Sequence, residues 1–347
     1  MASDASTPES GSASGSAFEP RPAFEAFDRL ARRRLLVVSG KGGVGRTTVS
    51  ALLGLELAAR GRRVLIGTTG HDDRLAWMLG REALTDRAVR VAPQLWIQRL
   101  VPSTCVREYG GIMMRSQRLS DMVFGNRLIK RMLGAVPGLD DYAVLGKAWH
   151  EAARGEDYDT VIFDGAASGH LRLNLGVPRA IVETAPQGIL VDEAAAVCET
   201  LRDPEASAAV LVGLPETWPM TELSELARGL HEDVGLHLGA LVVNKRWRAD
   251  LPAFHEATGD GLDGGAGLGG ANRLAYEALR RSVLRSLSER EAVAEWAARD
   301  ATPALDEQAR LDLPFMADGL DGPKAFEQLR ARLAEAVGPT RSGGGPG

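Results

Sequence analysis

The chain has 347 residues, and its 41 lysine and arginine residues against 46 aspartate and glutamate residues give a net charge of -5 at pH 7. That balance excludes a general electrostatic attraction to nucleic acid or to an acidic membrane surface. The hydrophobic share of 44% suits a folded globular protein, and the two cysteines, Cys105 and Cys198, provide neither a disulfide framework nor a paired zinc motif.

The first 24 residues form a tail rich in serine, alanine, glycine and acidic side chains. The tail has neither the charged start nor the apolar centre of a secretion signal, so we expect residues 1–24 to be disordered. No uninterrupted apolar stretch of the sequence reaches the roughly 18 residues that cross a bilayer. The sequence therefore predicts a cytoplasmic protein without a transmembrane segment.

A short apolar run at residues 35–38 ends in Ser39 and Gly40, which is typical of a strand buried on both faces of a parallel sheet. Residues 47–59 follow with apolar side chains at helical spacing and with Gly61 just beyond them, which predicts a helix. A strand, a glycine-rich loop and a helix thus open the ordered part of the chain.

The alternation of strand and helix then repeats along the chain. Four further apolar runs predict strands, at residues 64–66, 160–163, 209–212 and 240–243. Residues 311–315 resemble a short last strand, and Pro323 begins a helix. Strands separated by helical segments imply an α/β fold with a doubly wound, mostly parallel sheet. We expect one domain over residues 25–338, followed by a second disordered tail at 339–347.

Residues 105–205 are predicted to be a largely helical subdomain inserted into this fold, and residues 258–272 a flexible, glycine-rich loop. Apolar side chains recur at intervals of three and four residues between 105 and 154, and several are methionines, which are flexible and polarisable. Either they form an adaptable groove for an apolar client helix, or they pack an ordinary helical subdomain. These side chains are Met113, Met114, Leu119, Met122, Phe124, Leu128 and Met132.

Residues 40–47, with the sequence GKGGVGRT, match the spacing of a phosphate-binding loop, in which two glycines five residues apart precede a basic residue and a hydroxyl. Glycine lets consecutive backbone N–H groups turn inward, and the following helix adds the positive end of its dipole. Thr47 supplies the hydroxyl that such loops place on Mg²⁺. The predicted nucleotide-binding residues of this segment are Gly40, Lys41, Gly42, Gly43, Val44, Gly45, Arg46, Thr47 and Thr48.

Asp164 directly follows the apolar run at 160–163. Because parallel strands end at the same edge of a sheet, its carboxylate is expected beside the phosphate-binding loop, where it can hold a Mg²⁺-bound water. A plain helix cap is the alternative for this residue. Thr47 and Asp164 are therefore the predicted metal-binding residues, with ATP and Mg²⁺ as the predicted ligands.

The segment Lys41-Gly42-Gly43-Val44-Gly45 resembles the deviant Walker A motif of the MinD/ParA and ArsA ATPases, a group of P-loop NTPases. A second segment at residues 164–173, DGAASGHLRL, is similar to the DTAPTGHTLRL segment of the arsenite-translocating and tail-anchored-protein-targeting ATPases. The chain is identified as a member of the ArsA-like ATPase family on these two segments. Leu214-Pro215-Glu216 and Asn244, which follow later strands, extend the resemblance over about residues 34 to 333.

The resemblance implies several roles for individual residues. Lys41 would reach across a dimer to the partner's phosphates, so that Lys41, Arg46 and Asp164 are the predicted catalytic residues. Gly169 would sense the γ-phosphate through its backbone N–H and convert nucleotide state into movement of the helical subdomain. Asn244 would read adenine, although an asparagine at the end of a strand is as often a capping or turn residue.

Two positions depart from the family pattern. Arg46 stands in place of the loop lysine, and a planar guanidinium does not simply replace a compact ammonium beside the β- and γ-phosphates. Where the family has the aspartate that orients the attacking water, residues 67–73 read GTTGHDD, with no carboxylate at the expected position. Asp72 or Asp73 either takes over this task or is simply solvated. We therefore expect nucleotide binding to be retained and turnover to be weakened or lost.

Three functions remain open at this point. The first is a slow or conditional ATPase that uses nucleotide-dependent rearrangement of a homodimer to handle an apolar or membrane-bound client. The second is a hydrolysis-impaired regulatory subunit in a heterodimer with an active paralogous ATPase. The third, a MinD/ParA-type positioning ATPase, usually has a basic amphipathic terminal helix, and the final helix here is not strongly basic. Arsenite transport is not expected, because it requires clustered thiolates, and neither is nucleic-acid binding.

Overall fold

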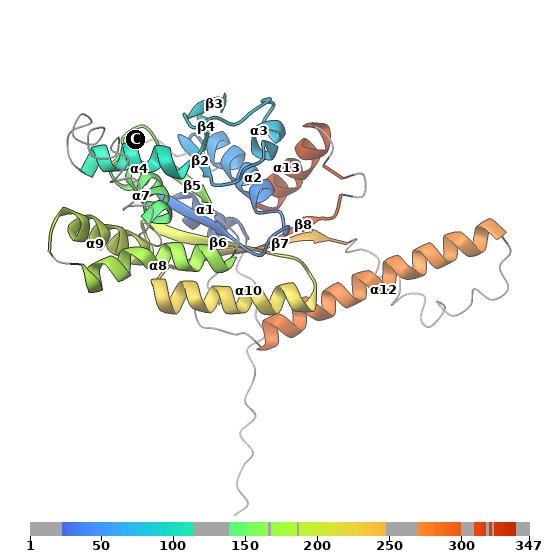
Figure 1. The fold of residues 1–347 in the computed structure, drawn as a ribbon. Coiled ribbons are helices and arrows are strands. Elements are labelled where there is room, and N and C mark those ends of the chain that lie inside the picture. Colours follow the sequence, from blue (N-terminus) through green and yellow to red (C-terminus); the bar gives the residue numbers. More distant parts are fainter. Residues whose placement is uncertain are drawn as a thin grey trace, which may run out of the picture.

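The computed structural model describes residues 23–113, 139–165, 168–185, 187–247, 270–299, 309–316, 319–320 and 323–337. At their centre is an eight-stranded sheet with the order β3-β4-β2-β5-β1-β6-β7-β8. Helices cover both faces of this sheet (Figure 1). The strands are β1 Leu35–Ser39, β2 Val64–Thr68, β3 Val89–Ala92, β4 Leu95–Arg99, β5 Thr160–Asp164, β6 Ser207–Gly213, β7 Leu238–Arg246 and β8 Ala309–Pro314.

Neighbouring strands in the sheet are parallel, except that β3 and β4 form an antiparallel hairpin at one edge. The sheet and its covering helices confirm the predicted α/β fold. Every apolar run that predicted a strand overlaps one of the strands β1, β2, β5, β6, β7 or β8, and only the last run, at residues 311–315, extends one residue past its strand. The first four of these are buried along their whole length, which explains why their sequences are continuously apolar rather than alternating.

The edge hairpin is a feature that the apolar runs do not predict. β3 has only four residues, none of them fully buried, and its second residue is the charged Arg90. The turn to β4 places Gln94 at a φ of 61°, in the left-handed region that few residues other than glycine adopt. An edge position therefore removes the strong apolar signal that marks the central strands.

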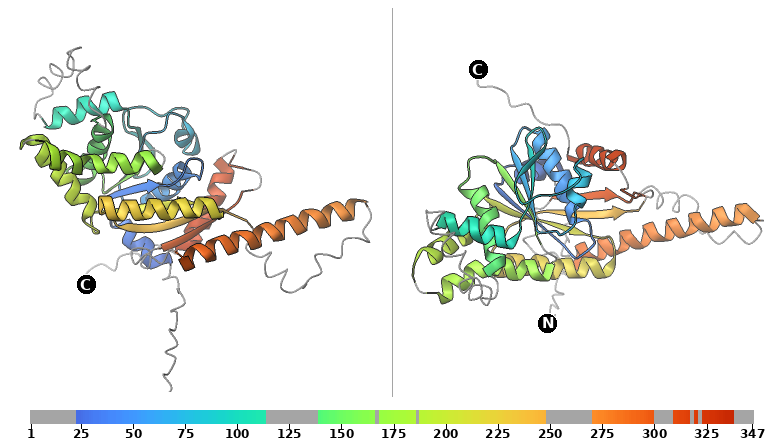
Figure 2. Two further views of the ribbon diagram at one scale, coloured as in Figure 1. Left: turned by 60° about the horizontal axis from the view of Figure 1, so that its bottom comes forward. Right: turned by 45° about the horizontal axis from the view of Figure 1, so that its top comes forward.

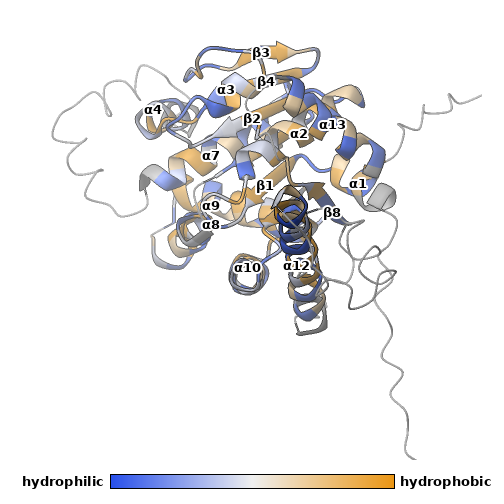
Figure 3. Cartoon of the chain, turned by 90° about the vertical axis from the view of Figure 1, so that its right-hand side faces the viewer, coloured by the Kyte–Doolittle hydropathy of each residue, from blue (hydrophilic) through white to orange (hydrophobic). Residues whose placement is uncertain are grey.

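The two faces of the sheet carry two separate hydrophobic cores. Leu35 and Val37 of β1 belong to the core under α4, α7, α8, α9 and α10, whereas Leu36 and Val38 belong to the core under α1, α2, α3 and α13. Figure 3 shows hydrophobic and hydrophilic residues alternating along the helices around the sheet. The helices are α1 Ala23–Ala31, α2 Arg46–Ala59, α3 Arg74–Met78, α4 Pro102–Met113, α7 Leu139–Ala153, α8 Ser168–Thr184, α9 Ile189–Arg202, α10 Thr217–Gly229 with the π-helical turn η1 Leu230–Val234, α12 Gly270–Arg299 and α13 Pro323–Val337.

The helices α4, α7, α8 and α9 lie together at one side of the molecule (Figure 1), within the stretch that is predicted to be a helical subdomain. β5 belongs to the same stretch of sequence and pairs with β1 and β2, so this stretch also contributes to the central sheet. Residues 114–138, which carry Met114, Met122 and Met132 of the predicted apolar groove, lie outside the described residues. So do residues 1–22 of the first predicted tail and all of the second, residues 339–347, whereas the last two residues of the first predicted tail are helical, because α1 begins at Ala23.

Helix α12 has 30 residues and extends away from the sheet (Figure 2). Its C-terminal half packs on α10, where Trp296 Nε1 donates a 2.5 Å hydrogen bond to Ser224 Oγ. The helix begins at Gly270, so the last residues of the predicted flexible loop are helical, and the rest of that loop lies outside the described residues. Among the helices that the structure describes, none is long and apolar enough to span a membrane.

Candidate nucleotide-binding site

The loop between β1 and α2 lies at the carboxyl edge of the sheet and depends on its glycines. Gly43 and Gly45 have φ angles of 83° and 98°, which favour glycine over every other residue. A Cβ on Gly40 would overlap the carbonyl oxygen of Val212, and one on Gly45 would overlap the Asn244 side chain. The glycine pattern in the sequence therefore has a direct steric cause in this loop.

Asp164 lies at the foot of the loop, where two threonine hydroxyls donate to the same oxygen. Thr47 Oγ1 is 2.8 Å from Asp164 Oδ2, and Thr68 Oγ1 is 3.0 Å from it. The three residues meet because β5 lies between β1 and β2, with Asp164 in register with Val38 and Thr68. The sequence predicted the pairing of Thr47 and Asp164 at this edge but gave no role to Thr68.

Burial dominates the electrostatics of the Asp164 carboxyl, which is only 3% exposed. Loss of hydration raises the pKa of Asp164 above its ordinary value, while the hydrogen bonds from Thr47 and Thr68 and the positive charge of Arg46 act in the opposite direction. The charge of Asp72 raises this pKa further. A divalent cation beside Asp164 would remove the cost of keeping the carboxylate ionised.

Arg46, the first residue of α2, donates from Nη1 to the carbonyl oxygen of Gly165 at 2.6 Å. Burial lowers the pKa of its guanidinium and the charge of Asp164 opposes that shift, but arginine stays protonated in proteins. The side chain therefore joins the start of α2 to the residue that follows Asp164. A lysine, with its single ammonium group, would make this connection differently.

Lys41 does not line the cavity beside the loop. Its ammonium group forms a 2.7 Å ion pair with Glu222 Oε1 on α10, and the lysine side chain is 52% exposed. The resemblance assigns Lys41 to the phosphates of a partner, and in this arrangement the residue is instead paired within its own chain. Gly169, in the first turn of α8, is also exposed and lies outside the cavity lining.

Asn244, near the end of β7, supports the loop from the other side. Its Nδ2 donates to the carbonyl oxygen of Val44 at 2.8 Å, and its Oδ1 accepts a 2.9 Å hydrogen bond from the backbone N–H of Lys245. Both ends of the amide are thus used within the protein. The structural role that the sequence left open is present in this arrangement, and the reading of adenine stays a prediction.

A cavity of about 660 Å³ opens beside the loop, within the size range of small-molecule sites. The predicted residues that line it are Gly43, Gly45, Arg46, Thr47, Thr48 and Asn244. The segment after β2 adds Gly70, Asp72 and Arg74. The sequence did not point to the remaining lining residues, which are Lys245, Pro314, Phe315, Met316, Gly319, Leu320 and Leu329.

Part of the cavity lining is apolar, and its Phe315 side chain is held by neighbouring side chains. The Phe315 ring lies 4.8 Å from the ring of Trp247, and the guanidinium of Arg285 on α12 lies 4.5 Å from the same indole. Lys245 has a φ of 58°, an uncommon conformation for a lysine, at the point where β7 ends beside the cavity. An aromatic and aliphatic lining next to a phosphate-binding loop suits a nucleotide base.

The structure separates the two neighbouring aspartates after β2. Asp73 Oδ1 accepts a 2.8 Å hydrogen bond from the backbone N–H of Leu84 and forms a 2.6 Å ion pair with Arg99. Asp72 lines the cavity, and its Oδ1 accepts a weak 3.2 Å hydrogen bond from the N–H of Arg74. Asp73 is therefore committed to local structure, whereas Asp72 faces the candidate site.

The residues present fit a nucleoside triphosphate with Mg²⁺. Mg²⁺ is usually held by one or two protein oxygens together with phosphates and water, and Thr47 and Asp164 offer such oxygens. The described residues contain no group of three or more histidine, cysteine, aspartate or glutamate side chains that could hold a metal ion. The backbone N–H groups of the loop and the Arg46 guanidinium supply donors for phosphate oxygens.

Comparison with known proteins agrees with this geometry. Residues 33–184, which contain the glycine loop, Thr68 and Asp164, match the family model described as anion-transporting ATPase. The ATPase BagA of Mycobacterium tuberculosis is 26% identical over 330 residues, which cover 89% of this chain and 95% of that protein. The arsenical pump-driving ATPase of Acidiphilium multivorum is 27% identical over 60% of this chain and 39% of its own length. The ATPase GET3 of Lachancea thermotolerans is 28% identical over 42% of this chain and 45% of its own length.

Proposed function

On the premise that the chain is a member of the ArsA-like ATPase family, an ATP-binding P-loop ATPase, we propose that it binds Mg-ATP in the cavity beside α2. We further propose that it hydrolyses ATP slowly, and that hydrolysis rearranges a dimer that handles an apolar client. The observation that supports Mg-ATP binding is the cluster of Thr47, Thr68 and Asp164 at the foot of the glycine loop. A buried carboxylate with two hydroxyl partners at the end of a parallel strand suits a cation that is shared with phosphate. We expect the protein to act in the cytoplasm.

In the nucleotide complex, Thr47 and Asp164 would hold Mg²⁺ together with phosphate oxygens. Bound Mg²⁺ neutralises the charge of the phosphates and stabilises the charge that develops during transfer. The loop residues from Gly40 to Thr48 would position the phosphates through their backbone N–H groups and the helix end. Arg46 would contribute a positive charge, and Asn244 would keep the loop in its nucleotide-ready shape through Val44.

Slow turnover follows from the two departures from the family pattern. The guanidinium of Arg46 is engaged by the carbonyl oxygen of Gly165, so it is poorly free to follow the charge that moves onto the leaving phosphate. Asp72 is the carboxylate that faces the cavity after β2, and we propose that it orients the attacking water in place of the missing aspartate. Ground-state phosphate binding depends less on such geometry, so we expect nucleotide affinity to be retained although turnover is slow.

The apolar client is supported by the side of the molecule that α8, α9 and α10 form. Large apolar side chains are exposed there, with Leu173 at 71%, Ile189 at 62% and Trp218 at 77%. The three residues lie on neighbouring helices, since α8 contacts both α9 and α10, and exposed apolar surface of this kind can mark an interaction site. Together with the family resemblance, this region fits a client segment that is itself apolar.

A second candidate function is a regulatory subunit that binds nucleotide, has lost hydrolysis and pairs with an active paralogue. The bond between Arg46 and the carbonyl oxygen of Gly165 favours it, because it fixes the one substituted cation of the loop. Phosphate release by the purified chain, measured alone and with the paralogue, separates the two functions. Brisk hydrolysis by the chain alone eliminates the regulatory subunit.

The direct test is calorimetric titration with ATP, in Mg²⁺ and in EDTA, of the wild type and Asp164→Asn. We expect the wild type to saturate and to bind more tightly in Mg²⁺. The variant should lose at least about tenfold of that Mg²⁺-dependent affinity, because a metal-holding carboxylate has been removed. Asp157→Asn, which changes an exposed carboxylate, is the matched control and should behave as the wild type. Absence of saturation at millimolar ATP, with and without the paralogue, would rule out the proposed function.

A further inference from the structure

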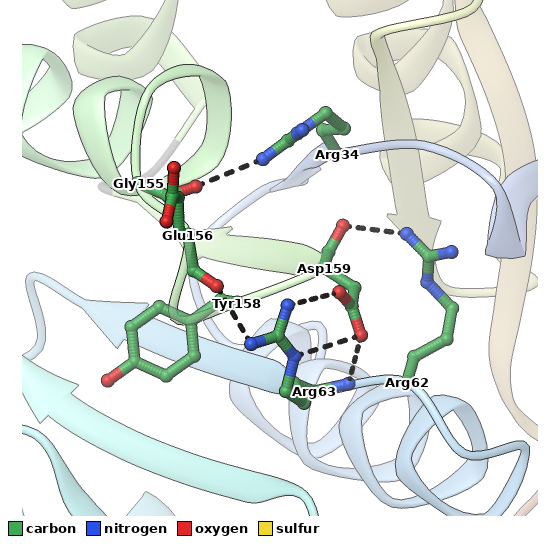
Figure 4. Close-up of a pocket in the computed structure, with 7 residues that line it drawn as sticks. All are labelled: Arg34, Arg62, Arg63, Gly155, Glu156, Tyr158 and Asp159. Carbon is green, nitrogen blue, oxygen red and sulfur yellow. Dashed lines mark hydrogen bonds and ion pairs between the residues drawn. The ribbon is translucent and has the colours of Figure 1, made fainter.

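A second cavity, of about 420 Å³, lies at the amino-terminal edge of the sheet (Figure 4). It is at the opposite ends of the strands that carry the phosphate-binding loop and Asp164. Its lining is mostly polar and includes three arginines. The residues around it are Arg34, Arg62, Arg63, Gly155, Glu156, Tyr158 and Asp159.

The sheet order explains why these arginines meet. Arg34 immediately precedes β1, Arg62 and Arg63 precede β2, and Asp159 precedes β5. β5 pairs with both β1 and β2 in parallel, so the residues just before the three strands come together at one edge. Arg34 is thereby placed around one space with the adjacent pair Arg62 and Arg63.

The Asp159 carboxylate pairs mainly with Arg63, one of the three arginines. Arg63 Nη2 is 2.7 Å from Asp159 Oδ1, and the backbone N–H of Arg63 donates to Asp159 Oδ2 at 2.9 Å. This pairing raises the pKa of Arg63 and lowers the pKa of Asp159. The negative charge of Asp159 therefore balances Arg63 and leaves the other two arginines without a carboxylate partner at this edge.

Arg34 and Arg62 form their hydrogen bonds with neutral groups. Arg34 donates from Nε to the carbonyl oxygen of Ala152 at 2.5 Å and from Nη2 to that of Gly155 at 3.2 Å. Arg62 donates from Nε to Thr160 Oγ1 at 2.9 Å and from Nη2 to the carbonyl oxygen of Asp159 at 2.6 Å. Within the described part of the chain, no carboxylate forms an ion pair with either side chain, and neither Nη1 group has an acceptor.

These contacts join the ends of α7, β2 and β5, and that structural task uses the Nε and Nη2 donors of both arginines. This structural task does not explain why two positively charged side chains share one cavity, or why the Nη1 group of each has no acceptor. Burial lowers the pKa of Arg62; the charge of Asp159 raises it again, and the charge of Arg34 lowers it, so the two guanidiniums repel each other. Three arginines against Glu156 and Asp159 leave the lining with a net positive charge.

We propose that this cavity binds a phosphate group, free or as a monoester, between Arg34 and Arg62. A phosphate dianion balances both unpaired cations at once, whereas a carboxylate would balance only one. Guanidinium forks match the geometry of phosphate oxygens, and the two Nη1 groups supply the donors. The cavity is also larger than one phosphate group, so the organic part of a monoester fits beside the ion. This site is separate from the nucleotide cavity.

The position of the site is tested by soaking crystals of the full chain with tungstate, a phosphate-like anion that anomalous scattering locates. We expect a tungstate ion within hydrogen-bond distance of the Arg34 and Arg62 guanidiniums. The phosphate-binding loop at residues 40–47 serves as the internal reference in the same crystal. A map in which tungstate fills that loop and leaves the arginine cavity empty overturns the proposal.

The affinity is tested by calorimetry with inorganic phosphate and with phosphoserine on protein saturated with Mg-ADP. The double variant Arg34→Gln/Arg62→Gln should lose at least about tenfold in affinity, which corresponds to about 1.4 kcal/mol. Arg32→Gln/Arg87→Gln, which removes two exposed arginines elsewhere, should bind as the wild type does. An equal loss in this control pair contradicts a specific site.

A second double variant, with lysine at both positions, tests the site if the glutamine variant does not fold. Arg34→Lys/Arg62→Lys keeps both charges but loses the guanidinium forks, so we expect a measurable loss of affinity that is smaller than for glutamine. Unchanged affinity in a folded lysine pair overturns the bidentate site. Tighter binding of phosphoserine identifies a monoester ligand, and tighter binding of inorganic phosphate identifies the free ion. A tungstate peak without affinity for either ligand in solution means an adventitious ion only and ends the proposal.

Discussion

Arg46 is the residue at which the chemistry of the site departs most from the family pattern. Its guanidinium carries the positive charge of the phosphate-binding loop and at the same time donates to the carbonyl oxygen of Gly165. A lysine at this position would keep the charge and release that carbonyl. The substitution therefore affects the mobility of the cation more than the presence of charge.

Arg46→Lys is expected to raise ATP turnover about tenfold or more with little change in nucleotide affinity. The restored ammonium can move with the charge that develops on the phosphates, and one well-placed donor of this kind is worth about 10²–10³ in rate. Steady-state phosphate release and calorimetry on the same samples measure both quantities. A drop in turnover would mean that Arg46 itself contributes to catalysis.

Asp164→Asn is expected to raise the melting temperature of the nucleotide-free protein at pH 7.5 by a few degrees, since about 1 kcal/mol moves it by roughly 2–4 °C. Burial raises the pKa of Asp164, so the stability that this carboxyl contributes is present below its unfolded-state pKa and is lost as the pH rises through its folded-state pKa. The advantage of the variant should therefore shrink as the pH falls toward about 4. Thermal melts from pH 4 to pH 8 measure this, and an advantage that grows at low pH contradicts the assigned direction.

Glu222→Gln is expected to tighten Mg-ATP binding by about two- to fivefold, because in the proposed complex Lys41 would have to leave Glu222 to contact phosphate. The ion pair is partly exposed, so its contribution is at most about 1 kcal/mol and should fall with added salt. Glu225→Gln, an exposed neighbour on α10, is the control and should leave the affinity unchanged. Equal affinities for both variants would show that Lys41 does not contact the nucleotide.

At the scale of elements, the segment between β2 and α3 assigns different tasks to two adjacent carboxylates. Asp73 bonds to Leu84 and Arg99 and so holds the segment that leads to β3, while Asp72 lines the nucleotide cavity. The sequence left both possibilities open because adjacent residues in a loop carry no periodic signal. Only the folded segment separates a structural carboxylate from one that faces the site.

Asp72→Asn should lower turnover by at least about tenfold and leave the melting temperature nearly unchanged, because a carboxylate that orients water acts on rate. Asp73→Asn should do the reverse, since it removes one partner of a hydrogen-bonded ion pair. The background variant Arg46→Lys provides measurable turnover for both assays. Equal turnover of the background and its Asp72→Asn derivative would exclude Asp72 as the water-orienting group.

The elements that sequence reasoning could predict are those with a strong apolar signal. β1, β2, β5 and β6 are continuous apolar runs because both of their faces are buried, and the meeting of Thr47 with Asp164 follows from parallel strands alone. The hairpin of β3 and β4 is short and lies at the edge, so its residues are only partly apolar. Helix α12 combines a long exposed stretch with a short packed one and has no continuous apolar stripe.

The apolar part of the cavity lining shows why the candidate site was only partly predictable. Phe315 and Met316 follow the last strand of the sheet, so the rule that strand ends meet at one edge would have drawn attention to them. Their role is hidden in the sequence because Phe315 is positioned by Trp247 and Arg285, which belong to other elements. Contacts between residues so far apart leave no local pattern.

At the scale of the whole molecule, the exposed apolar residues on α8, α9 and α10 give a direct prediction about the client. Leu173→Ser/Ile189→Ser/Trp218→Ser should lose binding to a fluorescent, leucine-rich helical peptide and keep Mg-ATP affinity. Fluorescence anisotropy of the labelled peptide, in the presence of Mg-ATP, measures peptide binding. Leu274→Ser/Leu279→Ser, which replaces two of the three large apolar residues exposed on α12, is the matched control. Peptide binding that survives the triple variant would place the client elsewhere.

The contacts among Phe315, Trp247 and Arg285 have a mechanical consequence. Phe315 lines the nucleotide cavity, and Arg285 lies on α12 about halfway between Gly270 and Arg299. The fifteen residues from Gly270 to Arg285 span about 22 Å at a rise of 1.5 Å per residue, so a tilt of about 10° at the arginine moves the tip by about 4 Å. A ligand that displaced the Phe315 ring would therefore act near the middle of α12, and the end of the helix at Gly270 would move further than the ring does.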